Sequence, residues 1–346
     1  MSAKPANNGP TIRVNRDFLK DAPEYAVRQL RDYQRGVANV RKAAVKANSA
    51  LPERSWQVVD DTVYQTKDDT LTLVSDLREA GLETSVDLMV KNDTWPLVDD
   101  EGQANTAMTP EVESDEGALS WAQDGVPVPI SYDFFTLGFR EAPAPESGRA
   151  TEESIDTLGA TTTTRRVNEE IEDLFLYGWD ETIQFDGEGY TLYGLTNHPQ
   201  TNTDTVTADW TSDATVIRDD FRAARSVIKN DNKFSPGEAG YWVYLGTEFY
   251  DALDEADPEG DGNMTVRDRV ENLAGIDRIR ELDRLGEKEM LMFRPTEDVV
   301  DVGVGAEVQP VQWEDPFRDY WAVLGSVYPR VKRTKTGQSG VLHWTV

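Results

Sequence analysis

The folds open to this chain are limited first by a long polar segment between two strand-like stretches. Residues 99–117 are polar and acidic, and the chain returns through Gly125-Val-Pro-Val-Pro-Ile130 and the aromatic run that follows. Pro127 and Pro129 lack backbone N–H groups, so we expect the returning strand at the edge of a sheet. Residues 89–138 therefore predict an extended β-hairpin with a long tip. Loops of this length inside a domain are usually functional.

The rest of the chain predicts a mixed α+β protein. Residues 151–179 keep an apolar stripe at helical spacing and form the longest predicted helix, although the threonines at 161–164 are β-branched and weaken its middle. A short helix is expected over 75–80, before Gly81.

Beyond residue 212, predicted helices alternate with predicted strands, which favours a compact α/β unit. Ser212 or Asp213 is the expected N-cap of the first of these helices. The first helix is expected to start near Ser212, with Ile217, Phe221, Ala224 and Ile228 on one face, and further helices are expected at 247–256 and 266–273. The strands are expected at 241–245, 276–279, 290–293, 299–304, 320–328 and 340–346.

The chain is strongly acidic, and its charge is unevenly distributed. It holds 35 Lys and Arg residues against 64 Asp and Glu, a net charge of −29, yet residues 1–50 hold ten basic and four acidic side chains. Those fifty residues carry 10 − 4 = +6, so the remaining 296 carry −29 − 6 = −35. The asymmetry predicts a basic arm that contacts nucleic acid or an acidic neighbour. The alternative is a solvated basic helix that pairs with the acidic surface of its own chain.

The residue types behind this charge are typical of a halophilic protein. Asp and Glu dominate, while Lys is scarce, at 11 residues against 24 Arg. Self-repulsion is largely screened in molar salt, where the Debye length falls to about 3 Å. We therefore expect a protein that works in brine; the alternative is an ordinary acidic cytosolic protein. No stretch of eighteen apolar residues and no apolar signal segment occurs, which predicts a soluble protein made in the cytoplasm, with no membrane partner.

Few residues are available for catalysis. The chain has no Cys, and its two histidines, His198 and His343, are too few for a three-His zinc site. Neither has a Ser or carboxylate partner at a motif spacing, and no P-loop, GxGxxG or GxSxG motif occurs. Both histidines are expected to be structural, and no catalytic or cofactor-binding residue is predicted. A pair of carboxylates acting in hydrolysis stays open, since 64 acidic residues always contain some pair.

One acidic loop approximates the ligand spacing of a calcium site. Asp257, Glu259 and Asp261 alternate with other residues, Gly262 follows, and Asp268 comes six residues later. Oxygen ligands at alternate positions can converge on one cation, and the glycine permits a sharp turn. The loop departs from the pattern at Glu259, where Asp or Asn is usual, and at Asp268, where a bidentate Glu is usual. A solvated acidic loop is the simpler interpretation.

The order of these segments carries a family resemblance. A basic arm and helix, a long hairpin, a long helix ending Glu172-Asp-Leu-Phe-Leu-Tyr-Gly178, a Gly194-Leu-Thr-Asn-His-Pro199 turn, an α/β unit and two terminal strands follow one another. In this order the chain resembles the major capsid proteins of tailed viruses with the Hong Kong 97-type fold, and the related encapsulin shell proteins. Tyr177-Gly178 and the Gly-Leu-x-Asn-x-Pro turn are its most specific pieces. With the acidic composition, the chain looks like the capsid protein of a tailed virus of haloarchaea.

The resemblance implies a division of the chain. Its segments would be an N-terminal arm and helix at 1–50, the first part of a peripheral domain at 51–88, an extended loop at 89–138, the peripheral domain with its spine helix at 139–199, an α/β axial domain at 200–310, and return strands of the peripheral domain at 311–346. The loop at 251–261 would lie near the centre of a capsomer, where like-charged copies meet.

The function implied is structural, not enzymatic. The chain would assemble with itself into hexamers and pentamers of an icosahedral shell around double-stranded DNA, in the host cytoplasm, and would reside in the virion. Separate scaffold and portal proteins would be its partners, and the basic arm would contact the packaged DNA without sequence specificity. No cofactor is implied. The alternatives are an encapsulin-like compartment and a halophilic carboxylate-dependent hydrolase.

Two features of the family can be compared with these residues. Some members crosslink a Lys of the extended loop to an Asn near the C-terminus. Lys91 is the only Lys between residues 68 and 228, and residues 301–346 contain no Asn, so this crosslink is not expected. Some members carry a long scaffolding segment that is removed. Only about fifty residues precede the body here, which favours a separate scaffold.

Overall fold

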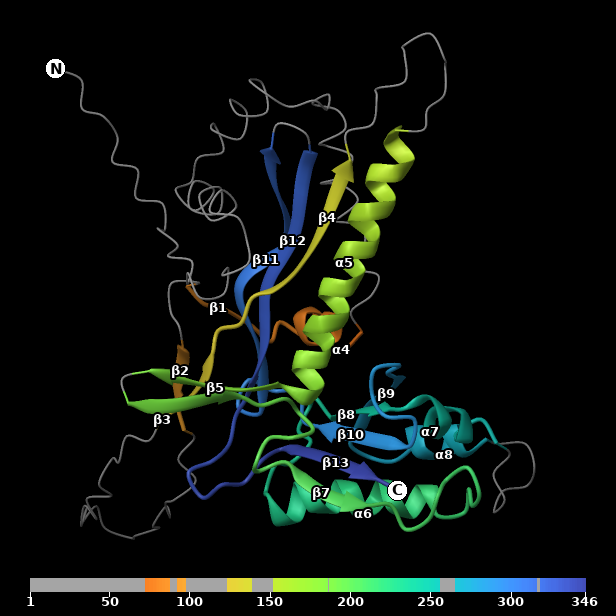
Figure 1. Cartoon of the computed structure of the whole chain (residues 1–346). Helices are drawn as coiled ribbons and strands as arrows, with labels where there is room; N and C mark the ends of the chain where they lie inside the picture. The colour runs from red at the N-terminus through yellow and green to blue at the C-terminus, as the bar shows by residue number, and fades with distance from the viewer. Residues whose placement is uncertain are drawn as a thin grey trace, which may run out of the picture.

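We describe the fold from a computed structural model, which covers residues 72–87, 92–97, 123–138, 152–185, 187–255, 265–315 and 318–346. The secondary structure is mixed α+β, as the sequence predicts. Two larger sheets and two separate β-hairpins organise this part of the chain (Figure 1). None of the helices in these ranges combines the length and the apolar character that crossing a membrane would require.

A four-stranded sheet with two long strands stands upright in Figure 1. Its strands, in spatial order, are β1 (Glu83–Ser85), β11 (Val300–Asp315), β12 (Arg318–Val331) and β4 (Ser131–Gly138). The two long strands are antiparallel along their length, with register shifts between Val304 and Gln309. β1 joins one edge in parallel and β4 joins the other antiparallel.

The longest helix, α5 (Glu152–Tyr177), runs along this sheet and packs against β4 and β12 (Figure 1). Val167, Ile171 and Phe175 are buried at the predicted helical spacing. The threonines in its middle do not interrupt it, because the buried Thr164 hydroxyl donates to the Ala160 carbonyl one turn earlier, at 2.7 Å. The helix predicted over 151–179 is therefore confirmed.

Helix α4 (Thr72–Glu79) is the predicted short helix before Gly81. Gly81 adopts a φ of +76°, and the Leu82 N–H donates to the Leu77 carbonyl at 3.0 Å, which is a Schellman end. At the other end, the backbone N–H groups of the first two residues donate to one Glu172 oxygen of α5, at 2.6 and 3.1 Å. The start of α4 is therefore capped by a side chain from another helix.

A five-stranded mixed sheet forms the second unit. In spatial order its strands are β7 (Asn202–Thr205), β13 (Val341–Thr345), β10 (Glu289–Phe293), β8 (Tyr241–Leu245) and β9 (Ile276–Glu281). The helices of this unit are α6 (Ile217–Ser226), which continues as a π-turn over Val227–Asp231, α7 (Thr247–Ala252) and α8 (Val266–Glu271). The central strands β8 and β10 are almost wholly buried, as expected for strands covered on both faces.

Aromatic side chains fill the core of the second unit. Trp210 is fully buried, and its ring stacks on Phe221 and Phe249 with centroids 5.4 and 4.3 Å apart. Its Nε1 donates to the buried Asp220 at 2.8 Å. The polar end of the indole is therefore satisfied inside the core.

Two details differ from the sequence predictions. Helix α6 begins after Val216 without a side-chain cap, so neither Ser212 nor Asp213 is its N-cap. Asp213 instead accepts from the Thr215 N–H at 3.0 Å, in a turn that precedes the helix. The range 311–346 is also divided: β12 lies in the four-stranded sheet, whereas β13 pairs with β10 and β7 in the five-stranded one.

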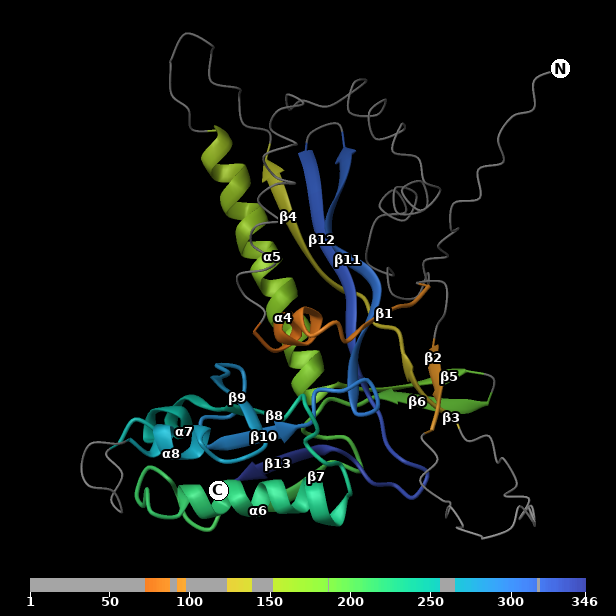
Figure 2. The ribbon, with the colours of Figure 1, turned by 180° about the vertical axis from the view of Figure 1, so that it is seen from behind.

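The two hairpins lie beside the lower end of β12, on the side away from the five-stranded sheet (Figure 2). One pairs β2 (Asn92–Pro96) with β3 (Gln123–Pro127), antiparallel as predicted, and β4 leaves it to join β12. The other pairs β5 (Trp179–Phe185) with β6 (Glu188–Leu192). Within the described ranges β3 pairs only with β2, so Pro127 lies in a strand with a free side, as its missing N–H requires.

Candidate functional site

The described part of the β2–β3 hairpin is anchored to the body at a cluster that we call the hairpin joint. A cluster of buried apolar side chains, separate from the main core, gathers there from β2, β3 and the segment after it, α5, β6 and β12. Its members are Trp95, Val126, Val128, Leu174, Leu192 and Tyr328. Burial in this cluster stabilises the hairpin against α5, β6 and β12 by the hydrophobic effect.

Charged side chains inside the joint connect the hairpin to β12. Arg330 is only 7% exposed, and its Nε lies 2.8 Å from Asp93 Oδ2 of β2. The angle is not that of a hydrogen bond, so this contact is an ion pair. The guanidinium carbon lies 4.9 Å from the centre of the Trp95 ring, within reach of a cation–π interaction. The hydroxyl of Tyr328 also donates to Asp93 Oδ2, at 3.3 Å.

The same arginine reaches a second carboxylate in the four-stranded sheet. Arg330 Nη1 donates to Asp301 Oδ2 at 2.9 Å, and Asp301 is fully buried. Lys332 Nζ and the Thr84 hydroxyl donate to that oxygen at 2.9 and 3.1 Å. Two carboxylates and two cations thus form a network without net charge, which is how ionised groups are tolerated inside a protein.

The joint also contains the end of α5, which is capped by a distant turn. The Leu195 N–H donates to the Phe175 carbonyl at 2.8 Å, and the Thr196 N–H donates to the Leu176 carbonyl at 3.0 Å. Asn197 Nδ2 donates to the next carbonyl of the helix, at 2.5 Å. The Gly194-Leu-Thr-Asn turn therefore supplies donors to the orphan carbonyls of the last helical turn. The Tyr177-Gly178 end of α5 and the Gly194-Leu-Thr-Asn turn, the two most specific motifs of the family resemblance, are therefore in contact.

Two glycines permit this contact. Gly178 has a φ of +69°, and a Cβ placed there would lie 2.2 Å from the Leu192 carbonyl oxygen. A Cβ on Gly194 would lie 2.3 Å from the Leu176 carbonyl oxygen. Real Cβ atoms do not approach backbone atoms this closely, so the helix end and the turn can cross only with hydrogen at both positions.

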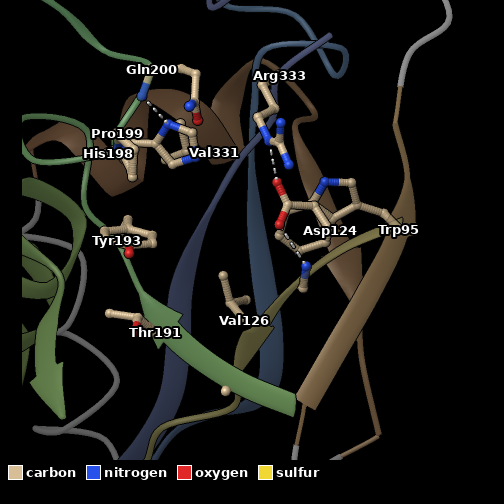
Figure 3. Close-up of a pocket in the computed structure, with 12 residues that line it drawn as sticks. Trp95, Asp124, Val126, Thr191, Tyr193, His198, Pro199, Gln200, Val331 and Arg333 are labelled. Carbon is tan, nitrogen blue, oxygen red and sulfur yellow. Dashed lines mark hydrogen bonds and ion pairs between the residues drawn. The ribbon is translucent and has the colours of Figure 1, made fainter. Parts of the chain in front are cut away.

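A pocket of about 280 Å³ opens beside the joint (Figure 3). His198 and Tyr193 lie on one side of it, and Asp124 with Arg333 lies on the other. Arg333 Nε donates to Asp124 Oδ2 at 2.9 Å, which adds a second ion pair between the hairpin and the chain after β12. This pair is internally matched, so the pocket walls offer no net charge that would attract an ion.

His198 forms part of the wall of this pocket. It is 8% exposed, and burial lowers its pKa from the ordinary 6.5 to about 4, so the ring is neutral at pH 7. Its Nδ1 accepts from the Gln200 N–H at 3.3 Å, which places the proton on Nε2. The other histidine, His343, lies on β13 with Nε2 2.9 Å from Glu289 of the paired strand. Neither contact includes a nucleophile.

The buried carboxylates serve structural partners. Asp93 and Asp301 belong to the joint, Glu172 caps α4, and Asp220 binds Trp210. Asp76, 1% exposed, accepts from the Tyr244 hydroxyl at 2.7 Å and lies near two arginines of β9. Each of these carboxylates has a partner within the fold. Within the described ranges, no three His, Cys, Asp or Glu side chains gather as a metal site.

Several predicted site residues lie outside the described ranges. These are the basic arm at 1–50, Lys91, and the calcium ligands Asp257, Glu259 and Asp261. Asp268, the fourth calcium ligand, is described and forms a capping box with Thr265 at the start of α8. Its Oδ2 accepts from the Thr265 N–H at 3.0 Å. A helix-capping role accounts for Asp268 without a cation.

The sequence predictions did not include the residues of the joint. A signal was present, because Arg330 and Lys332 flank Val331 at the end of an apolar strand, where buried cations require partners. The partners themselves, Asp93 and Asp301, come from segments far away in the sequence and carry no motif.

Comparison with known proteins gives one family and one fold. The model of a family of unknown function, DUF6260, matches residues 44–344. None of the curated proteins matches the sequence. Among solved structures, the virus-like particle from Pyrococcus furiosus matches with a TM-score of 0.55 and 14% identity, over 83% of this chain and 98% of that chain.

Two further solved structures have TM-scores below 0.5. The capsid of Myoviridae phage XM1 matches at 0.49 with 10% identity, over 74% of this chain and 83% of that chain. The capsid of an empty GTA particle matches at 0.47 with 12% identity, over 80% and 97%. At these identities a likeness shows the fold alone, and the match to the Pyrococcus furiosus particle supports it.

Proposed function

Because this chain belongs to DUF6260, a family of unknown function, and shares its fold with the chain of a virus-like particle, we propose that it is a structural protein that assembles into a shell. The observation that carries the proposal is the extent of the likeness, which includes nearly the whole of the particle's chain. A match confined to one sheet would not favour a shared role, since a fold supports many functions.

The surface of the described chain favours assembly. Tyr132 and Phe134 on the edge strand β4 are 43% and 41% exposed, and their rings meet edge to face with centroids 5.1 Å apart. Aromatic side chains are enriched at protein interfaces. No described side chain of β2 or β3 belongs to the main core, which suits a hairpin that contacts a neighbouring copy.

The finer assignment is a major capsid protein of Hong Kong 97 type. Its copies form hexamers and pentamers of an icosahedral shell around double-stranded DNA, within the virion of a tailed virus of haloarchaea. The basic residues 1–50 contact the packaged DNA or an acidic neighbour, and separate scaffold and portal proteins take part in assembly. The hairpin serves as the extended loop, α5 as the spine helix, and the five-stranded unit as the axial domain.

Electron microscopy of the purified full-length chain in molar salt tests the proposal. Closed shells or capsomers are the expected result, and monomers at every salt and protein concentration would refute it. Nuclease-resistant DNA in shells from infected cells supports a capsid, whereas an enclosed enzyme supports the encapsulin-like alternative. No observation on the described residues favours the carboxylate-dependent hydrolase.

Salt provides a second test. A net charge of −29 on every copy repels neighbouring copies, and lowering the salt from about 1 M to about 0.1 M lengthens the Debye length from about 3 to about 10 Å. Shells are therefore expected to dissociate as salt falls. Light scattering that stays constant over this range would show that charge repulsion does not limit assembly.

A further inference from the structure

We infer that Arg330 is a positioning residue, which fixes the direction of the β2–β3 hairpin relative to the four-stranded sheet within a single chain. Among the described side chains, it contacts a carboxylate of the hairpin and a carboxylate of the sheet at once. The inference rests on the proposed function for its purpose, since a shell subunit must present its hairpin to a neighbour at one angle.

The geometry favours a bridge over two separate contacts. Asp93 and Trp95 occupy alternate positions of β2 and therefore point to the same side of the strand, toward Arg330. One edge of the guanidinium meets Asp93, another meets Asp301, and its face lies over the Trp95 ring. A planar group with several donors can make these contacts together, whereas a lysine ammonium is a single point charge.

Burial makes this bridge insensitive to salt. Asp93 and Arg330 are 9% and 7% exposed, so counter-ions have little access to them. The other ion pair of the hairpin, Asp124 with Arg333, has side chains that are each 29% exposed. This partly buried pair is more accessible to counter-ions, so salt screens it more than the bridge. In brine, the buried bridge is therefore the electrostatic contact that keeps holding the hairpin.

Charge alone does not separate the variants, because removing Arg330 or neutralising Asp93 leaves one unbalanced charge in the network; the contacts that remain identify the selective variant. Removing Arg330 leaves Asp93 buried without its cation, which destabilises both the hairpin and the body. Changing Asp93→Asn instead leaves Arg330 paired with Asp301, and Asp301 still holds Lys332. The Asp93→Asn change therefore uncouples the hairpin while the body keeps its own ion pairs.

Distance measurement by electron spin resonance tests the inference. The chain has no Cys, so two spin labels can be attached at Thr94→Cys in the hairpin and Thr162→Cys in α5, both exposed positions. Full-length, unassembled chain is measured in low and in molar salt. We expect one narrow distance peak for the parent at both salt concentrations, and loss of that narrow peak in Asp93→Asn.

Three further variants separate bridging from charge and from folding. Arg330→Lys keeps the charge but cannot bridge, so the narrow peak should be lost; Arg330→Met should lose it as well. Asp124→Asn, which breaks the more accessible pair with Arg333, should keep the narrow peak. Circular dichroism establishes that each variant is folded, and Asp93→Asn remains decisive if Arg330→Met fails to fold. A narrow peak at the parent distance in Asp93→Asn and Arg330→Lys would overturn the inference.

The outcome is independent of shell formation, because it is measured on single chains. If the hairpin is fixed as inferred and the chain forms no shells, the proposed function fails and the positioning role stands. If shells form and the Asp93→Asn peak stays narrow, the proposed function stands and the positioning role of Arg330 fails.

Discussion

Replacing Gly178 by Ala should destabilise the chain more than the same change at Gly81. Both glycines follow a helix and adopt positive φ, +69° and +76°, so an alanine at either site is placed in the left-handed region. They differ in their surroundings. A Cβ at Gly81 would meet nothing within 4 Å, whereas one at Gly178 would lie 2.2 Å from the Leu192 oxygen and 2.6 Å from the Gly194 nitrogen.

The magnitudes follow from these two costs. The left-handed conformation costs an alanine about 1–2 kcal/mol at either site. Overlap with backbone atoms that a strand and a capping turn hold in place adds about 1–3 kcal/mol at Gly178. We therefore expect Gly178→Ala to lower the free energy of unfolding by about 2–5 kcal/mol and Gly81→Ala by about 1–2 kcal/mol.

Urea unfolding of the unassembled chain in molar salt measures the difference. Both variants and the parent are compared at one protein concentration, by tryptophan fluorescence and circular dichroism. The Gly178→Ala midpoint should fall clearly below that of Gly81→Ala, with similar slopes. Equal losses would mean that the helix end and the 194–197 turn move apart without cost, and the reasoning from close approach would be refuted.

Three other predictions concern buried polar groups. Burial raises the pKa of Glu172 above its ordinary 4.5, so the folded chain binds the carboxyl proton more tightly than the unfolded chain does. Stability should therefore fall as pH rises from 4.5 through the folded pKa. Urea midpoints between about pH 4 and 8 should show this loss in the parent and not in Glu172→Gln. His198 gives stability the opposite dependence on pH. Because burial lowers its pKa from 6.5 to about 4, stability should fall by up to about 3 kcal/mol as pH drops through this interval. The His198→Asn variant should show a flatter dependence of the urea midpoint on pH. Trp210→Ala should cost about 3–5 kcal/mol by emptying a stacked core site, and Trp210→Phe, which leaves Asp220 without the indole donor, about 1–3 kcal/mol. Thermal unfolding that ranks the phenylalanine variant below the alanine variant would contradict this reasoning.

The elements that could be predicted are those whose pattern is local. Helix α5 follows from an apolar residue at every third or fourth position, and Gly81 marks the end of α4 because few other residues accept its φ. Strand β8 follows from five consecutive apolar or aromatic residues, 241–245, all of which are buried in the structure. The predicted N-cap of α6 is wrong, because Asp213 binds the backbone two residues on and the helix begins later.

The hairpin joint could not be predicted, because its contacts are long-range. Tyr328 and Asp93 are 235 positions apart, and Arg330 meets Asp93 only because β2 passes beside the end of β12. The sequence also does not indicate which of the two sheets β13 joins. A short apolar strand can be buried in either sheet, and only the tertiary structure shows that β13 pairs with β10.

What the sequence by itself determined is the class of protein: mixed α+β, acidic, with a long helix, a hairpin and a basic first segment. It also contained the Tyr177-Gly178 and Gly194-Leu-Thr-Asn motifs, but as two separate signals. Only the tertiary structure decided that the second caps the first, and that one arginine joins the hairpin to the sheet. The physical reason is that periodicity records which face of an element is buried, while the partner of that face depends on how distant segments pack.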